Sequence, residues 1–316
     1  MAAITDGLTF DLPNHVGELF YLTPSETPFL SMIGGMTGGV PCDAKEFTFQ
    51  TVDNAAAAQP AILEGDDPVY AERVRSQLKN VTQIFQYGWR VSYTKLGAKG
   101  QLGSGGASPA ISSVSILGNQ PVQNELAFQQ RLKVERAARD MEYSFLQGTF
   151  ADPNDNTTAR KTRGILTATT TNVVNASSAP LTKARVDSLL KTMYDNGAPF
   201  RNPVIFVNAW QKMKLSEIYG YAPESRNVGG LNINQIETDF AALGVVLDRH
   251  MPAAQFGVFD LSVCVPRFMT VPMKGHFFSE EVAHTGASVN FQIYGEAGLE
   301  HGPEIWHGKI TNLTTS

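Results

Sequence analysis

The sequence predicts an α+β protein in which extended segments and one long helix precede a compact α/β region. Three observations predict this class. Apolar and polar residues alternate with period two in KEFTFQTV, residues 45–52, as in a strand with one buried face. A stripe of apolar residues with helical spacing runs through residues 119–148. Strand-like and helix-like segments then alternate over residues 179–285.

Composition and charge exclude several classes of protein. Two cysteines, Cys42 and Cys264, provide no disulfide framework, and the N-terminal residues lack the pattern of a signal peptide. No run approaches the roughly 18 apolar residues of a membrane-spanning helix. The formal net charge of -5 disfavours a protein that coats nucleic acid, because neutralising phosphates requires clustered Lys and Arg. We therefore expect a cytosolic chain without a membrane partner.

Residues 1–45 are predicted to form an extended arm, because prolines and glycines interrupt any periodicity. Large apolar groups nevertheless gather in a segment too short and too glycine-rich to build a core. They belong to Pro28, Phe29, Leu30 and Met32. We expect these residues to contact the long helix or an adjacent subunit, and the glycines of residues 34–39 to form a flexible joint. A charge in place of Phe29 should then impair assembly more than solubility.

Residues 46–95 are predicted to form a protruding hairpin. The strand at residues 45–52 is expected to pair with VTQIFQYGWRVSY, residues 81–93, in which alternate residues share one apolar face. Nearly thirty residues separate the two strands, and a loop of that length is typically functional. We expect contacts between subunits at charged residues of this hairpin, namely Asp66, Asp67, Arg73, Arg75 and Lys79.

The strongest helical signal lies within residues 96–178. Pro121 suits a first helical turn and Gly148 suits a helix exit, which predicts a helix over about residues 119–148. At ~1.5 Å per residue, such a helix is roughly 40 Å long and spans a whole domain.

The region that follows is predicted to be mixed α/β. It should contain a helix near residues 183–196, a buried strand at residues 203–208 and a second helix at residues 209–220. Strand patterns return in the tail, residues 286–316.

No group of residues in the sequence predicts a catalytic, cofactor-binding or metal site. The glycine runs GGMTGG and GSGGAS lack the Gly-Lys-Ser/Thr of a phosphate-binding loop, and no Gly-x-Ser-x-Gly elbow occurs. His301 and His307 in HGPEIWH would lie too far apart along a strand to share one metal ion with Glu304. We therefore expect a protein that is not an enzyme.

The order of these segments resembles the major capsid proteins of tailed bacteriophages. Short motifs carry the resemblance in chain order: TPSETPFLSMIG, KEFTFQTV with the acidic tip LEGDD, NVTQIFQYGWRVS, RAARDMEYSFLQG with TRGIL, IETDFAALGVVLDRHMP, and YGEAGLE with HGKITNL. The resemblance implies the Hong Kong 97-type fold. Its regions would be an N-arm (1–45), an extended loop (46–95), a peripheral domain with a spine helix (96–178), an axial domain (179–285) and C-terminal strands returning to the peripheral domain (286–316).

The resemblance implies a shell protein that self-assembles into the hexamers and pentamers of an icosahedral head around packaged double-stranded DNA. The implied partners are a portal at one vertex, a decoration protein and DNA that is contacted only weakly. Because no fused scaffolding segment precedes the arm, we expect a separate scaffolding protein. The implied location is the virion, after assembly in the cytoplasm of a bacterial host.

Three alternatives stay open from the sequence alone. An encapsulin-type nanocompartment shell would share the fold and require an inner pocket for a cargo peptide. A soluble α/β enzyme is compatible with residues 180–260 but lacks a recognisable catalytic motif. A tail or decoration protein would lack the long helix.

Overall fold

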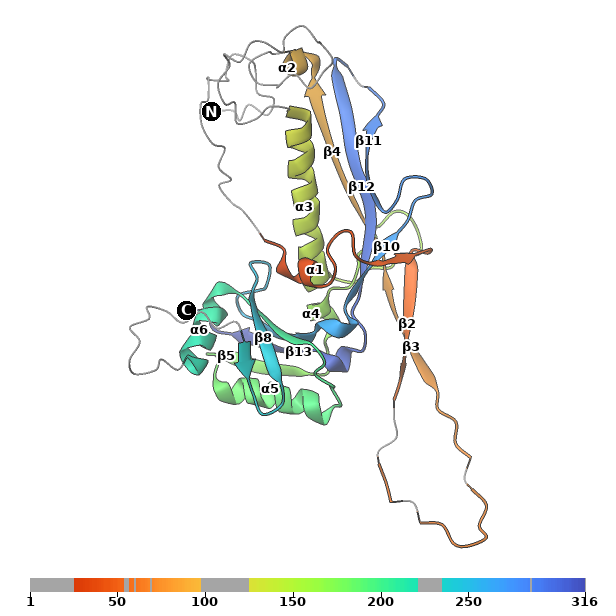
Figure 1. The fold of residues 1–316 in the computed structure, drawn as a ribbon, viewed down its shortest axis with the longest axis vertical. Coiled ribbons are helices and arrows are strands. Elements are labelled where there is room, and N and C mark those ends of the chain that lie inside the picture. Colours follow the sequence, from red (N-terminus) through yellow and green to blue (C-terminus); the bar gives the residue numbers. More distant parts are fainter. Residues whose placement is uncertain are drawn as a thin grey trace.

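The computed structural model describes residues 26–53, 57–59, 61–68, 70–97, 125–220, 235–284 and 286–315. Three parts are visible in Figure 1: an elongated sheet with a long helix along it, a second sheet flanked by helices, and a hairpin that projects away from both. Among the described helices, none is long and apolar enough to cross a membrane.

The first sheet is organised around its longest strand, β12 (Ser288–Glu300). One edge of β12 pairs antiparallel with β4 (Gln83–Ser92) over ten residues. The opposite edge pairs with β11 (Phe277–Val282) and β10 (Val265–Met269), and β10 pairs in parallel with β1 (Val40–Cys42). As predicted, alternate residues of β4 face inward, with Phe85, Trp89 and Val91 buried.

The long helix α3 (Glu125–Gln147) lies along β4 and β12 (Figure 1). This confirms the predicted helix over the described residues, and its predicted start at residues 119–124 lies outside them. The apolar stripe is buried only in its second half, since Met141 and Phe145 are fully buried whereas Val134 is 40% exposed. The helix ends before Gly148, where a Cβ atom would lie 2.3 Å from the carbonyl oxygen of Ser144.

The projecting hairpin consists of β2 (Glu46–Val52) and β3 (Arg75–Val81), which pair over seven residues. The hairpin was predicted, but its predicted return strand is wrong, because residues 83–92 pair with β12 instead of β2. The change of partner occurs at the buried Thr82, whose N–H donates to the carbonyl oxygen of Lys45 at 2.8 Å. The alternating segment therefore belongs to the first sheet, and the non-alternating β3 pairs with β2.

The second sheet has six strands in the order β5-β13-β9-β6-β8-β7. Their bounds are β5 Val173–Ala179, β13 Gly308–Leu313, β9 Phe256–Asp260, β6 Pro203–Val207, β8 Ala242–Leu247 and β7 Gln235–Glu237. The helices α5 (Lys183–Asp195) and α6 (Ala209–Tyr219) pack against it. The predicted helices and the predicted buried strand of this region are confirmed.

Short helical elements join these parts. They are α1 (Pro28–Met32), α2 (Tyr93–Gly97), α4 (Ile165–Ala168), and the 3-10 turns η2 (Leu261–Val263) and η3 (Glu304–Trp306). The main hydrophobic core is continuous between the two sheets, because it contains Phe85 of the first sheet, Met141 of α3 and Phe206 and Phe259 of the second sheet. The two sheets therefore share apolar burial.

Candidate assembly surfaces and the arm joint

The arm segment enters the core of its own chain. Phe29 is 0% exposed and Leu30 2% exposed, and the ring of Phe29 meets those of Phe206 and Phe259 edge-on at centroid distances of 5.4 and 6.4 Å. Pro28 opens the helix α1 at its first turn, where its missing N–H costs nothing. The prediction of an extended backbone at residues 28–32 is therefore wrong, whereas the predicted contact of this segment with the long helix is confirmed. Contact of the segment with an adjacent subunit stays a prediction. Met32 is 47% exposed, and Pro28 is half-buried.

A carboxylate on the long helix holds this segment in place. The backbone N–H groups of Phe29 and Leu30 donate to Oε1 and Oε2 of Glu142 at 2.8 and 2.6 Å. Glu142 is 0% exposed, and burial raises the pKa of its carboxyl, with the neighbouring Asp248 raising it further. No role was assigned to Glu142 from the sequence alone. Only its position next to the apolar stripe indicated otherwise.

The glycines expected to form a flexible joint occupy a tight turn. Gly34 has a positive φ of 121°, and a Cβ atom there would lie 2.1 Å from the carbonyl oxygen of Gly38. The N–H of Gly38 donates to the carbonyl oxygen of Gly34 at 2.8 Å, which closes the turn. A Cβ atom on Gly39 would lie 2.5 Å from the Phe268 ring. Close backbone approach therefore explains why these positions require glycine.

The base of the hairpin is tied to the body by polar contacts. Lys79 Nζ lies 3.1 Å from Asp152 Oδ2 and 3.6 Å from Glu46 Oε2, and Lys45 reaches the same Asp152 at 3.6 Å. The hydrogen bond to Asp152 raises the pKa of Lys79, so its amine stays charged. Asn80 is fully buried and donates through Nδ2 to the carbonyl oxygens of Arg163 and Leu299.

The structure does not bring the other predicted hairpin residues together. The guanidinium of Arg75 donates to Gln50 Oε1 at 3.0 Å, and that of Arg73 donates to the carbonyl oxygen of Asp53 at 2.9 Å. Asp66 and Asp67 are exposed in the loop between β2 and β3, at least twelve residues along the chain from Lys79. These charged residues are spread along the projecting hairpin and form no cluster with one another.

Sequence reasoning missed the apolar side chains of the hairpin. Ile62, Leu63, Tyr70 and Val74 are 67%, 79%, 90% and 85% exposed. They lie between charged residues, so the sequence shows no apolar pattern there. A group of large apolar side chains at such exposure indicates a surface that a partner covers.

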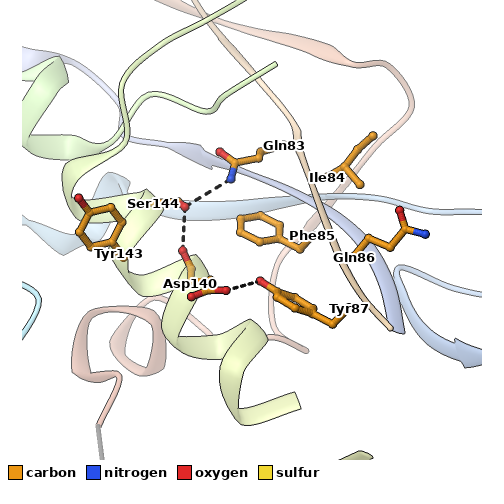
Figure 2. A pocket seen from close by; sticks show the side chains of 8 residues that line it. All are labelled: Gln83, Ile84, Phe85, Gln86, Tyr87, Asp140, Tyr143 and Ser144. Carbon is orange, nitrogen blue, oxygen red and sulfur yellow. Dashed lines mark hydrogen bonds between the residues drawn. The ribbon is translucent and has the colours of Figure 1, made fainter. Parts of the chain in front are cut away.

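A shallow groove of about 310 Å³ separates β4 from α3, as Figure 2 shows. On its floor Tyr87 donates to Asp140 Oδ2 at 2.7 Å, and Ser144 donates to the backbone carbonyl of Asp140 at 2.7 Å. Ile84 and Tyr143 are 45% and 52% exposed beside it. No described strand pairs with the edge of β4 that faces away from β12. Among the described residues, the groove thus combines an unpaired strand edge with exposed apolar groups.

The two histidines of HGPEIWH lie in the crossover between the sheets. His307 Nδ1 accepts the N–H of Asp260 at 3.2 Å, so its Nε2 carries the proton and donates to the carbonyl oxygen of His301 at 2.6 Å. Burial lowers the pKa of His301 to about 4, and that of His307 is also lowered by burial. Both rings are therefore neutral near pH 7 and support the backbone. In the described ranges no three His, Cys, Asp or Glu side chains gather at metal-binding distance.

A long helix along an elongated sheet, a second sheet sharing its core and a projecting hairpin together form the Hong Kong 97-type fold. The chain belongs to the SU10 major capsid protein family, whose model matches residues 3–314. The prediction of a major capsid protein of a tailed phage is thereby confirmed, and such a protein is part of the virion. The family is one of structural proteins.

Solved structures share the fold at low sequence identity. The capsid of the native GTA particle is similar with a TM-score of 0.65 and 13% identity, over 99% of each chain. The capsid of cyanophage A-1(L) is similar with a TM-score of 0.61 and 11% sequence identity, over 98% of this chain and 99% of that chain. The holo-SrpI encapsulin of Synechococcus elongatus has a TM-score of 0.58 and 10% sequence identity, over 96% of this chain and 93% of that chain. None of the curated proteins matches the chain.

Proposed function

We propose that this chain assembles with copies of itself into the hexamers and pentamers of an icosahedral head that encloses packaged double-stranded DNA. The projecting hairpin carries this proposal. A two-stranded hairpin is only marginally stable in water by itself, and this one exposes four large apolar side chains. Covering them with an adjacent subunit in the head would remove that surface from water.

The groove between α3 and β4 of a neighbouring copy suits the hairpin tip. Extended chain can add backbone hydrogen bonds to an unpaired strand edge, and β4 offers such an edge among the described strands. The exposed Ile84 and Tyr143 would meet the apolar side chains of the tip. In this proposal the rim of the contact is formed by charged residues of the hairpin, namely Asp66, Asp67, Arg73 and Arg75. Further candidates for contacts between subunits are Pro28, Met32 and Lys79.

The finer organisation of the chain and its partners is part of the same proposal. The division into N-arm, extended loop, peripheral domain, axial domain and C-terminal strands follows from the family resemblance. So do a separate scaffolding protein, a portal, a decoration protein and assembly in the host cytoplasm. The formal net charge of -5 supports weak contact with the packaged DNA, since tight binding would require a basic inner surface. No catalytic role is proposed.

Charging the hairpin tip tests the proposal. The double variant Ile62→Asp with Leu63→Asp should fold and stay soluble, because both side chains are exposed in the subunit. Its assembly should fall at least tenfold, since burying one such side chain is worth ~1.5–3 kcal/mol and ~1.4 kcal/mol is tenfold. Sedimentation and electron microscopy of particles produced in the host measure the yield.

The matched control is the double variant Ile62→Val with Leu63→Met, which keeps an apolar tip of similar volume. It should form normal particles. Normal particles from the doubly charged variant would show that the tip is not a contact and would remove the main support for the proposed assembly.

A further inference from the structure

Two buried carboxyl groups meet where three distant segments of the chain join. Glu142 comes from α3, and Asp248 follows β8 and is 1% exposed. The two side chains lie within hydrogen-bonding reach of each other. Glu142 also holds the backbone of α1 through two hydrogen bonds. Asp248 Oδ1 accepts the N–H of His250 at 2.7 Å, which fixes the turn after β8.

The hydrogen-bond donors around Glu142 and Asp248 leave one carboxyl oxygen without a partner. Each Glu142 oxygen has a backbone donor, and Asp248 Oδ1 has one as well. Asp248 Oδ2 is buried and has no donor. Leaving a buried acceptor unpaired is unfavourable, and so is placing two buried negative charges side by side. One hydrogen bond between the two carboxyl groups would remove both penalties.

We propose that Glu142 and Asp248 together bind one proton, and that this proton holds α1 to α3 and to the turn after β8. With the proton in place, the pair carries a single negative charge that accepts three backbone N–H groups. The site lies wholly within one subunit, so the inference does not depend on the proposed contacts between subunits. A metal ion suits the site less well, because the described residues supply no third acidic, His or Cys ligand there.

The direction of the pKa shift agrees with this geometry. Burial raises the pKa of Glu142 above its ordinary value of 4.5, and the hydrogen bond and charge of Asp248 raise it further. The proton is therefore bound more tightly in the folded chain than in the unfolded chain. Its contribution to stability is complete below about pH 4.5 and is lost as pH rises through the raised folded-state pKa.

Few other charges act on the pair. The helices α1 and α4 carry no titratable side chain. The charged or titratable groups of α3 within three residues of Glu142 are Arg139, Asp140 and Tyr143, and Tyr87 of β4 bonds to Asp140. Arg249 and half-buried His250 follow Asp248 in the chain. Arg249 is exposed, so solvent screens its charge.

The variant Asp248→Asn tests the inference, because an amide supplies the missing hydrogen without a titrating proton. Its Oδ1 can keep the N–H of His250 and its Nδ2 can donate to Glu142. Hydrogen exchange at Phe29 and Leu30 in the full chain, corrected for intrinsic rates, measures opening of the joint between pH 6 and 10. Opening of the native joint should increase by up to tenfold per pH unit within the titration interval. In Asp248→Asn, the dependence of opening on pH should be weaker than in the native chain, because burial alone then raises the pKa of Glu142.

Glu135→Gln is the matched control, since it removes a charge from the exposed side of the same helix. It should keep the native dependence on pH. Infrared spectroscopy of the native chain at pH 7 gives a second readout, a protonated carboxyl band that is weaker in Asp248→Asn. Absence of that band from the native chain, or an Asp248→Asn variant with the native pH dependence, would overturn the inference.

Discussion

Replacing Phe29 with alanine is expected to lower the free energy of unfolding by about 3–5 kcal/mol. The ring is fully buried, and it contacts Phe206 and Phe259 in the core between the two sheets. Its removal creates a cavity whose walls belong to different segments and cannot close together easily. Chemical denaturation of the unassembled full chain, followed by circular dichroism, measures the change.

Met32→Ala is the matched control, because Met32 lies in the same short helix and is 47% exposed. It should change the free energy of unfolding by no more than about 0.5 kcal/mol. Phe29→Asp should give insoluble protein, which reverses the sequence-based expectation that a charge there would spare solubility. Similar small effects of Phe29→Ala and Met32→Ala would contradict the observed burial.

Asn80→Ala is expected to have the second largest effect. The Asn80 side chain donates to the carbonyl oxygens of Arg163 and Leu299, and its Oδ1 accepts the N–H groups of Arg163 and Val81. Truncation leaves several buried backbone groups without partners, each costing roughly 1–3 kcal/mol. The expected loss is therefore at least about 3 kcal/mol. Hydrogen exchange along β3 should accelerate together with global unfolding.

Gln77→Ala provides the comparison on the same strand, because Gln77 is exposed. It should leave both exchange and unfolding nearly unchanged. Equal effects of Asn80→Ala and Gln77→Ala would mean that the hairpin base does not depend on the buried amide.

The sequence predicted best those elements whose local pattern agrees with their burial. The fully buried strand β6 and its neighbouring helices α5 and α6 belong to this group, because a continuous apolar run and helical spacing each had one reasonable interpretation. The long helix was predicted for the same reason. Its buried acid was not recognised, because Glu142 is satisfied by backbone groups 112 and 113 residues away.

The errors share a physical cause. The helix α1 has five residues and depends on Glu142, so no local periodicity could indicate it. The alternation of residues 81–93 does not reveal that the chain changes partner at Thr82 or that the non-alternating β3 pairs with β2. The apolar residues of the hairpin tip are largely exposed in the fold, and only that exposure revealed them as a surface. The sequence therefore did not predict contacts between segments far apart in the chain, or surfaces that a second molecule would cover.

The crossover from β12 to β13 has a consequence for how the shell can curve. Subunits in fivefold and sixfold rings meet at different angles, so some hinge must absorb the difference. The crossover is a poor hinge, because His301 and His307 bind its backbone and a shared core joins both sheets. The subunit body, which consists of the two sheets and α3, should therefore be rigid. Changes in curvature would be absorbed by swinging of the hairpin, which its described residues join to the subunit body at the hairpin base.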